Sequence, residues 1–183
     1  MKNYNHTTYA ILGLLTTDCR SGYAIKQMID RSLNHFWKIS YGQIYPTLKL
    51  IVDEGLATVS ASSEDSKQGK NEYELTPKGK EVLKTWLEEP IEQIPVERNE
   101  ILLKLFFGSH QSKETTTDQL EEYKAKLENR YAAYTGIEEM LQNNYGEGED
   151  TKYWLFTLDY GKRTTKAAIE WCTVTLEAIS KEE

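Results

Sequence analysis

The chain has 183 residues, of which 39% are hydrophobic and 28% are charged, and its net charge is −7 at pH 7. These values describe an ordinary globular protein with room for one large domain or two small ones. No apolar run is long enough to span a membrane and the polar N-terminus contains no signal peptide, so we expect a cytoplasmic protein.

Two helices are predicted at the start of the chain. The first covers residues 7–15, an apolar run for which Thr7 or Thr8 is a suitable N-cap. The second begins after Ser21, which can cap it, and continues to Leu33 with apolar residues at helical spacing on one side. A compact apolar cluster is expected next, formed by Phe36, Trp37 and Ile39.

A third helix, from Gln43 to about Glu54, has two different faces. Apolar residues at i, i+4, i+7 and i+8 spacing form its back: Ile44, Leu48, Ile51 and Val52. Its front carries Gln43, Thr47 and Lys49, which can reach hydrogen-bond acceptors. Pro46 is tolerated near the first turn, and Gly55 supplies the C-terminal stop. A helix of this kind suits a recognition helix for the major groove, although a core helix of a small domain is the alternative.

The period of the pattern changes after Gly55 from that of a helix to that of a strand. Residues 56–61 and 71–76 alternate in polarity and predict a hairpin, that is, a wing, whose polar tip bears Lys67 and Lys70. A fourth helix then starts with Thr76 as N-cap and Pro77 as its first residue. Its buried side is predicted to consist of Val82, Leu83, Trp86 and Leu87. Pro90 and Pro95 bracket a linker, which places the domain boundary at about residue 90.

The remainder of the chain is predicted to be entirely helical. Residues 97–107 form a segment that is too apolar for a surface helix, and a long helix follows over residues 113–144. Large apolar residues recur in this helix at seven-residue intervals, namely Leu120, Leu127, Tyr134 and Leu141. The last helix, residues 153–179, has a stripe with small residues at its middle. Such helices cannot bury their stripes alone, which favours a dimer built from this half, although an antiparallel hairpin within one chain is an alternative and both can hold.

Charge is unevenly distributed between the two halves. Residues 1–88 contain 11 Lys and Arg against 10 Asp and Glu, a net charge of +1, whereas residues 89–183 contain 11 against 19, a net charge of −8. An acidic second half repels phosphate, so only the first half is suited to approach nucleic acid.

The order of these motifs resembles the PadR family of bacterial transcriptional regulators. The resemblance covers about residues 7–88, and three spaced motifs carry it: Gly42-x-Ile44-Tyr45-Pro46-x-Leu48, Glu54-Gly55-Leu56 and Tyr73-x-Leu75-Thr76-x-x-Gly79. The acidic second half looks like the longer C-terminal domain of that family's first subgroup. The resemblance implies a fold that is mostly α with a small β-hairpin: a winged helix-turn-helix DNA-binding domain at residues 1–90, then an all-helical dimerisation and effector domain at residues 91–183.

The resemblance also implies a homodimeric repressor that binds a palindromic operator in double-stranded DNA. By motif match, the residues expected at the DNA are Tyr41, Gln43, Tyr45, Thr47, Lys49, Lys67 and Lys70. Family members often respond to small aromatic effectors, and the candidate residues for such a pocket are Phe107, Trp154 and Trp171, which are alternatively part of the core or of a dimer seam. The chain departs from the family in one place, because Leu50, Ile51 and Val52 replace charged residues that are common there.

Motifs that carry enzymatic chemistry are missing from the sequence. His6, His35 and His110 have no metal-ligand spacing, and the widely separated Cys19 and Cys172 suggest neither a disulfide framework nor a metal site. There is no phosphate-binding glycine loop and no nucleophile elbow. We therefore expect no enzyme activity, cofactor or metal. Two alternatives to a DNA-binding regulator are a winged-helix protein-interaction module with an acidic helical arm and a small-molecule sensor without DNA binding.

Overall fold

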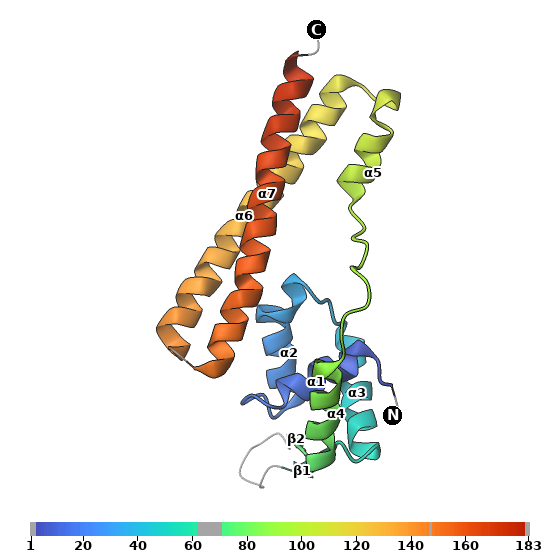
Figure 1. The fold of residues 1–183 in the computed structure, drawn as a ribbon, viewed down its shortest axis with the longest axis vertical. Helices are drawn as coiled ribbons and strands as arrows, with labels where there is room; N and C mark the ends of the chain where they lie inside the picture. Colours follow the sequence, from blue (N-terminus) through green and yellow to red (C-terminus); the bar gives the residue numbers. More distant parts are fainter. Residues whose placement is uncertain (1–2, 62–70, 147, 182–183) are drawn as a thin grey trace. The chain divides into compact units, whose positions relative to one another are not determined.

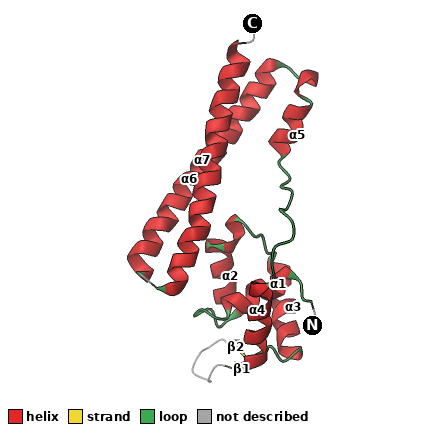
Figure 2. Cartoon of the chain, in the orientation of Figure 1, coloured by secondary structure: helices red, strands yellow, loops and turns green. Residues whose placement is uncertain are grey.

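A computed structural model describes residues 3–61, 71–146 and 148–181 of the chain. The chain divides into two compact units, which we call unit 1 (Met1–Ile94) and unit 2 (Pro95–Glu183). Helices account for 73% of the described residues, and the described strands form one two-stranded antiparallel sheet. Figure 2 shows the dominance of helix in both units. The predicted fold class, mostly α with a small β-hairpin, is confirmed.

Unit 1 contains the predicted three helices, hairpin and fourth helix (Figure 1). Its elements are α1 (His6–Leu14), α2 (Gly22–Arg31), the short 3-10 helix η1 (Leu33–His35), α3 (Tyr41–Asp53), β1 (Ala57–Ala61), β2 (Asn71–Leu75) and α4 (Pro77–Glu88). The strands pair in antiparallel register, with Ala57 opposite Leu75 and Ala61 opposite Asn71. One core joins the helices to the hairpin; its most buried side chains are Ile11, Leu12, Ile25, Ile29, Ile44, Leu48, Ile51 and Leu56.

Side-chain caps begin the helices of unit 1 much as the sequence predicts. Ser21 accepts a hydrogen bond from the backbone N–H of Ala24, and Thr76 accepts one from the backbone N–H of Gly79. The first helix differs, because its N-cap is Asn5, which accepts a hydrogen bond from the backbone N–H of Thr8 at 2.9 Å. The prediction of Thr7 or Thr8 was wrong by two or three residues, since Asn caps a helix as well as Ser or Thr does.

The end of α3 is fixed by the glycine that the sequence indicated. Gly55 has a φ of +68°, in the left-handed region that glycine adopts most readily. Its N–H donates to the carbonyl of Val52 at 2.9 Å, and the N–H of Leu56 donates to the carbonyl of Ile51 at 2.8 Å. These two bonds form a Schellman motif, which turns the chain out of α3 and into β1.

Pro46 lies inside α3, because the helix begins at Tyr41 and not at Gln43. Proline has no N–H, so the carbonyl of Gly42 lacks the donor that the fourth following residue would otherwise supply. The predicted location near the first turn was therefore one turn too early in the helix.

Several apolar residues predicted to be buried lie at the surface instead. Phe36 and Trp37 are exposed, whereas Ile39 between them and α3 is buried. Leu87 is also exposed, because α4 packs through Leu83 and through Trp86, whose ring stacks on that of Tyr9 with a centroid separation of 4.6 Å. The predicted apolar cluster before α3 is therefore not a compact unit, and Trp86 packs α4 against α1 through the rings of Tyr9 and His6.

A close backbone approach fixes α4 at the base of the hairpin. The N–H of Thr76 donates to the carbonyl of Leu56 at 3.0 Å. A β-carbon built on Gly79 would overlap that carbonyl oxygen and would lie 2.9 Å from the carbonyl carbon. Glycine is therefore the residue that lets the first turn of α4 rest against the end of α3.

Unit 2 is built around an antiparallel pair of long helices. Its elements are α5 (Glu100–Phe106), the 3-10 helix η2 (Gly108–His110), α6 (Lys113–Tyr145) and α7 (Glu149–Lys181). Figure 1 shows α6 and α7 side by side over their length. The residues of the seven-residue repeat are all buried: Leu120 and Leu127 with Cys172, and Tyr134 and Leu141 with Leu158. Residues of α7 in the same chain therefore pack against the repeat of α6, as the hairpin alternative predicts.

Small residues allow α7 to approach α6 closely. A β-carbon on Gly161 would lie 3.1 Å from the ring of Tyr134, and the adjacent Lys162 donates to the carboxylate of Glu138 at 2.6 Å. By contrast, α5 contributes mainly Ile101 to the core of unit 2. Its remaining large apolar residues are exposed: Leu102, Leu103 and Phe106, followed by Phe107. The prediction that this segment is too apolar for a surface helix was wrong for the described chain.

Candidate nucleic-acid interface

Helix α3 presents one face to the core and the other to solvent. Ile44, Leu48 and Ile51 are buried, and α1, α2 and β1 contact the helix. The exposed face carries the predicted Tyr41, Gln43, Tyr45 and Lys49. Because this face follows the α2–α3 turn, it has the geometry of a recognition helix in a helix-turn-helix unit.

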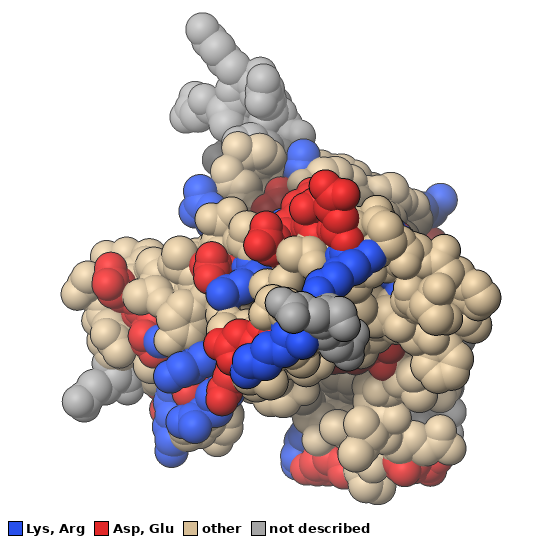
Figure 3. Space-filling view, turned by 90° about the horizontal axis from the view of Figure 1, so that it is seen from above, with Lys and Arg blue, Asp and Glu red and all other residues tan. Residues whose placement is uncertain are grey.

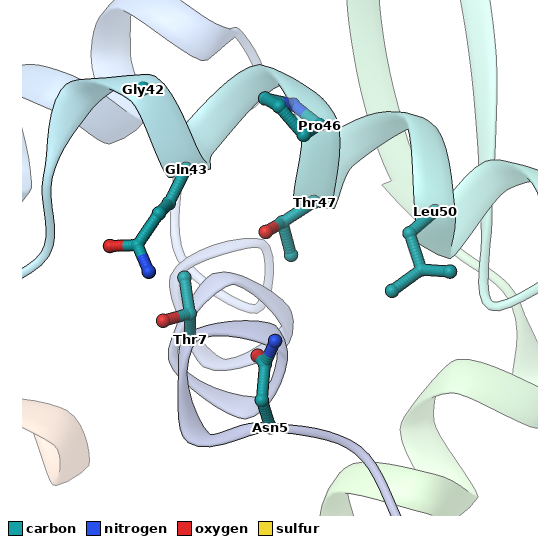
Figure 4. A pocket seen from close by; sticks show the side chains of 7 residues that line it. All are labelled: Asn5, Thr7, Gly42, Gln43, Pro46, Thr47 and Leu50. Carbon is teal, nitrogen blue, oxygen red and sulfur yellow. The ribbon is translucent and has the colours of Figure 1, made fainter.

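Thr47 does not share that exposed face, contrary to the prediction. Only 7% of its surface is exposed. Thr47 lies three residues after Ile44 and four before Ile51, which places it on the buried stripe of the helix. Its side chain therefore points toward α1, as Figure 4 shows.

Tyr41 is held by groups on α2. Its hydroxyl donates to the carboxylate of Asp30 at 2.5 Å, and the ammonium of Lys26 lies 4.1 Å from the centre of its ring. The hydrogen bond to Asp30 raises the pKa of the Tyr41 hydroxyl above its usual value. Tyr41 therefore links the end of α2 to the start of α3, and its hydroxyl proton is already engaged.

Gln43 uses one end of its side chain to cap α3. Its Oε1 accepts hydrogen bonds from the backbone N–H of Ser40 at 3.1 Å and from the hydroxyl of Ser40 at 3.0 Å. Since a backbone N–H can only donate, Oε1 must face Ser40, and Nε2 faces the opposite way. A bidentate contact to adenine needs both atoms, so Gln43 would have to release the cap to make one.

Tyr45 and Lys49 are the predicted residues that point most freely outward. Tyr45 is 63% exposed, although the edge of its ring lies against Gly22, where an added β-carbon would be 2.8 Å away. Lys49 is exposed and forms no ion pair with any residue that the structure describes. Lys67 and Lys70 lie outside the described residues, on the segment that joins β1 to β2.

A groove beside α3 was not anticipated from the sequence. Its volume is about 270 Å³, and residues from the start of α1 and the side of α3 line it (Figure 4): Asn5, Thr7, Gly42, Gln43, Pro46, Thr47 and Leu50. The signal that could have revealed it is Asn5, an N-cap residue that brings the polar start of α1 next to the recognition helix.

The three candidate effector residues do not come together. Trp154 packs with Tyr134, Leu141 and Leu158, whereas Trp171 packs with the cluster around Leu120. Seventeen residues of continuous helix separate the two tryptophans by about 25 Å, so one small ligand cannot contact both. Phe107 instead lines a separate groove of about 350 Å³ in unit 2, together with Leu103, Lys104, His110 and Gln111.

Other kinds of site receive no support from the described residues. No group of three or more His, Cys, Asp or Glu side chains among them is arranged to hold a metal ion. In the same residues we find no helix with the length and apolar character that crossing a membrane requires. On the face drawn in Figure 3, basic and acidic side chains are interspersed, so that face offers no broad basic surface.

Comparison with known families divides the chain at nearly the same place as the fold does. Residues 11–85 match the transcriptional regulator PadR-like family, and residues 97–180 match the family described as virulence activator alpha C-term. The first match covers α2, α3, the hairpin and most of α4, and the second covers α5, α6 and α7.

Individual relatives match over almost the whole chain. The chain is 32% identical to the negative transcriptional regulator PadR of Bacillus subtilis, over 95% of this chain and 97% of that protein. The crystal structure of Bacillus subtilis PadR in complex with operator DNA superposes with a TM-score of 0.85 at 30% identity, covering 96% and 99% of the two chains. The complex of the same regulator with p-coumaric acid gives a TM-score of 0.78 at 28% identity, covering 95% and 98%.

Proposed function

Because the chain belongs to the PadR-like family of transcriptional regulators, we propose that it is a homodimeric repressor that binds a palindromic operator and is released by a small aromatic compound. Its relatives are regulators and not enzymes. The observation that carries the proposal is the two-sided α3, whose back is buried in the core of unit 1 and whose front exposes Tyr45 and Lys49. The operator complex of a relative with the same fold supports it.

In the proposed mechanism, two copies of α3 enter successive major grooves about 34 Å apart. Lys49, with Lys67 and Lys70 on the hairpin segment, would neutralise phosphates, while the acidic second half of the chain is repelled by them. Binding both half-sites at once multiplies the affinity of each. An effector that changes the spacing of the two α3 helices would therefore release the DNA.

Replacing Lys49 by alanine tests its proposed role at the DNA backbone. We expect weaker DNA binding and a salt dependence reduced by about 0.9 for each phosphate that is no longer neutralised, because fewer counterions are released. The measurement is a DNA titration at several salt concentrations. Lys84→Ala is the matched control, since Lys84 is an exposed lysine of the same unit on α4. An unchanged salt slope would show that Lys49 does not bind phosphate.

The proposal as a whole is tested by titrating the protein against the promoter regions of its own gene and its neighbours, at two salt concentrations and with unrelated DNA as competitor. Selective, salt-sensitive binding is expected. Lys49, Lys67 and Lys70 substituted together by alanine should abolish it. A protein-interaction module or a sensor without DNA binding would show no selectivity at either salt concentration, for wild type or variant.

The groove around Phe107 suits the proposed effector. A phenolic acid such as p-coumaric acid, which the Bacillus subtilis relative binds, needs an apolar wall for its ring and a cation for its carboxylate. Leu103 and Phe107 supply the wall, and Lys104 and His110 also line the groove. Of the three candidate effector residues, Phe107 is therefore the one that we retain in the proposal.

Substituting Lys104 by alanine should raise at least about tenfold the concentration of p-coumaric acid that releases DNA, because the carboxylate loses its charged partner. Lys126→Ala is the matched control: each lysine pairs with a glutamate one turn earlier in its helix, Lys104 with Glu100 at 2.9 Å and Lys126 with Glu122 at 2.7 Å. The readout is release of labelled DNA. Equal behaviour of the two variants would exclude this groove as the effector site.

A further inference from the structure

We propose that the groove between the start of α1 and the side of α3 is a phosphate-binding site that receives one backbone phosphate of the operator. It would use neutral donors, namely the side chains of Asn5, Thr7, Gln43 and Thr47. The inference rests on the DNA binding proposed above, and it adds a contact from α1, an element outside the helix-turn-helix. It also gives the buried Thr47 a role different from base reading.

Two carboxamides of the groove are fixed with their donors toward it. Asn5 accepts through Oδ1 from the backbone N–H and the hydroxyl of Thr8, at 2.9 and 3.0 Å. Gln43 accepts through Oε1 from the backbone N–H of Ser40. Because a backbone N–H cannot accept, both oxygens are committed, and the Nδ2 and Nε2 groups remain as donors. Figure 4 shows both amide nitrogens turned toward the space between α1 and α3.

Thr47 is a largely buried residue that lines the same groove, and its hydroxyl has no partner among the described residues. It is 93% buried, yet its hydroxyl forms no hydrogen bond with any of them. Several other helical threonines donate to the carbonyl four residues earlier: Thr85, Thr117, Thr135, Thr157, Thr164 and Thr173. The buried Thr151 and Thr165 of α7, like Thr47, form no such bond with the described residues. Among the described residues, the fully enclosed side-chain oxygen without a partner is that of Gln119 and not that of Thr47. The Thr47 hydroxyl therefore opens into the groove that it lines, where it is able to donate to a ligand.

The electrostatics of the groove favour an anion. Both helix starts contribute to its lining, through Asn5, the N-cap of α1, and Gly42, the second residue of α3, and neither helix has an acidic residue in its first turn. The positive ends of two helix dipoles therefore lie beside the groove without a carboxylate in either first turn to compensate them. No side chain that lines the groove is charged, which is the donor set expected for a phosphate bound by hydrogen bonds alone.

This chemistry predicts a distinctive salt dependence. A lysine that neutralises a phosphate releases counterions, so its removal changes the slope of affinity against salt. Neutral donors release none, and their removal should lower the affinity by the same factor at every salt concentration. The groove and Lys49 are therefore distinguishable in one set of titrations.

Two substitutions test the site in the full-length protein. Thr47→Val keeps the shape and removes the hydroxyl, and we expect about fivefold weaker binding with an unchanged salt slope. Asn5→Asp retains the cap, since Asp caps as well as Asn, but it replaces the Nδ2 donor by a carboxylate oxygen. Like-charge repulsion should then weaken binding at least about tenfold. Asn129→Asp, an equal charge change at an exposed position of α6, is the control and should stay within about twofold.

A scan of the selected DNA with single neutral methylphosphonates identifies the source of the phosphate. We expect one position per half-site at which the neutral linkage weakens binding of the wild type but strengthens binding of Asn5→Asp, because it removes the repulsion between the introduced carboxylate and the phosphate. Identical scans for both proteins, or a decrease in affinity for Asn5→Asp no larger than for Asn129→Asp, would overturn the inference. Thermal unfolding of each variant confirms that it is folded.

Inorganic phosphate separates failure of this inference from failure of the proposed function. If the wild type binds no DNA selectively, the proposed function fails and the backbone-phosphate assignment falls with it. In that case we would titrate the protein with inorganic phosphate and follow the backbone amide NMR signals of Thr47 and Gln43. Saturable shifts in the wild type that are absent in Asn5→Asp would show that the groove binds a free anion. If the wild type binds DNA selectively and Asn5→Asp and Thr47→Val bind it with the same affinity, the proposed phosphate site is refuted while the proposed function stands.

Discussion

Replacing Gly79 by alanine should destabilise unit 1 by about 3 kcal/mol or more, the largest single-methyl effect that we expect in this chain. The added β-carbon would overlap the carbonyl oxygen of Leu56. That oxygen belongs to the backbone and already accepts from the N–H of Thr76, so it cannot move without breaking the bond. The first turn of α4 would have to leave the end of α3, and the base of the hairpin would shift with it.

The measurement is thermal or urea unfolding followed by circular dichroism. Gly13→Ala is the matched control, because a β-carbon on Gly13 meets no atom within 4 Å and the residue lies in α1. That substitution should leave stability unchanged or raise it by up to about 1 kcal/mol, since alanine restricts the unfolded chain more than glycine does. Equal unfolding temperatures for Gly79→Ala and the wild type would mean that α4 can move away from Leu56 without loss of stability.

Leu120→Ala should have the second largest effect, a decrease of about 2 to 5 kcal/mol in the stability of unit 2. Leu120 is fully buried in a cluster that joins α5, α6 and α7 through Ile101, Leu127 and Cys172. Truncation leaves a cavity at the point where three helices meet. Because the proposed dimer depends on unit 2, operator affinity should fall as well, although α3 lies in the other unit.

Met140→Ala is the control for this substitution, since Met140 is a large side chain of the same helix that is 37% exposed. It should cost less than about 1 kcal/mol. Unfolding monitored by circular dichroism gives the stability, and sedimentation gives the oligomeric state. A Leu120→Ala protein with a lowered midpoint and full operator affinity would contradict the dependence of DNA binding on unit 2.

Much of the fold could be predicted because local signals and tertiary contacts agree. Ser21 and Thr76 cap the helices that their positions indicated, and Gly55 ends α3 with a positive φ. These residues act on their immediate neighbours, so sequence alone reveals them. Trp37 and Leu87 are both apolar and occur at a spacing that suits burial, yet both are exposed. Whether a side chain is buried depends on which other element packs against it, and the periodicity of the sequence does not indicate that element.

The candidate site was predicted in outline but not atom by atom. Motif matching placed Thr47 at the DNA, whereas its spacing from Ile44 and Ile51 puts it on the buried stripe. Gln43 was predicted on the correct helix, but its bond to Ser40 depends on a helix start two residues earlier than expected. The groove at Asn5 required the start of α1 to lie beside α3, a tertiary contact that no motif encodes.

The closure of the α6 and α7 seam within one chain has a kinetic consequence. The two helices are joined by a short connection, so each buried pair forms without a search through a second molecule. Proteins fold faster when contacting residues are close in sequence, and in a helical hairpin the contacts near the turn join residues that are close in sequence. Unit 2 should therefore fold at a rate independent of protein concentration, and any self-association should appear as a later, second-order step between folded surfaces.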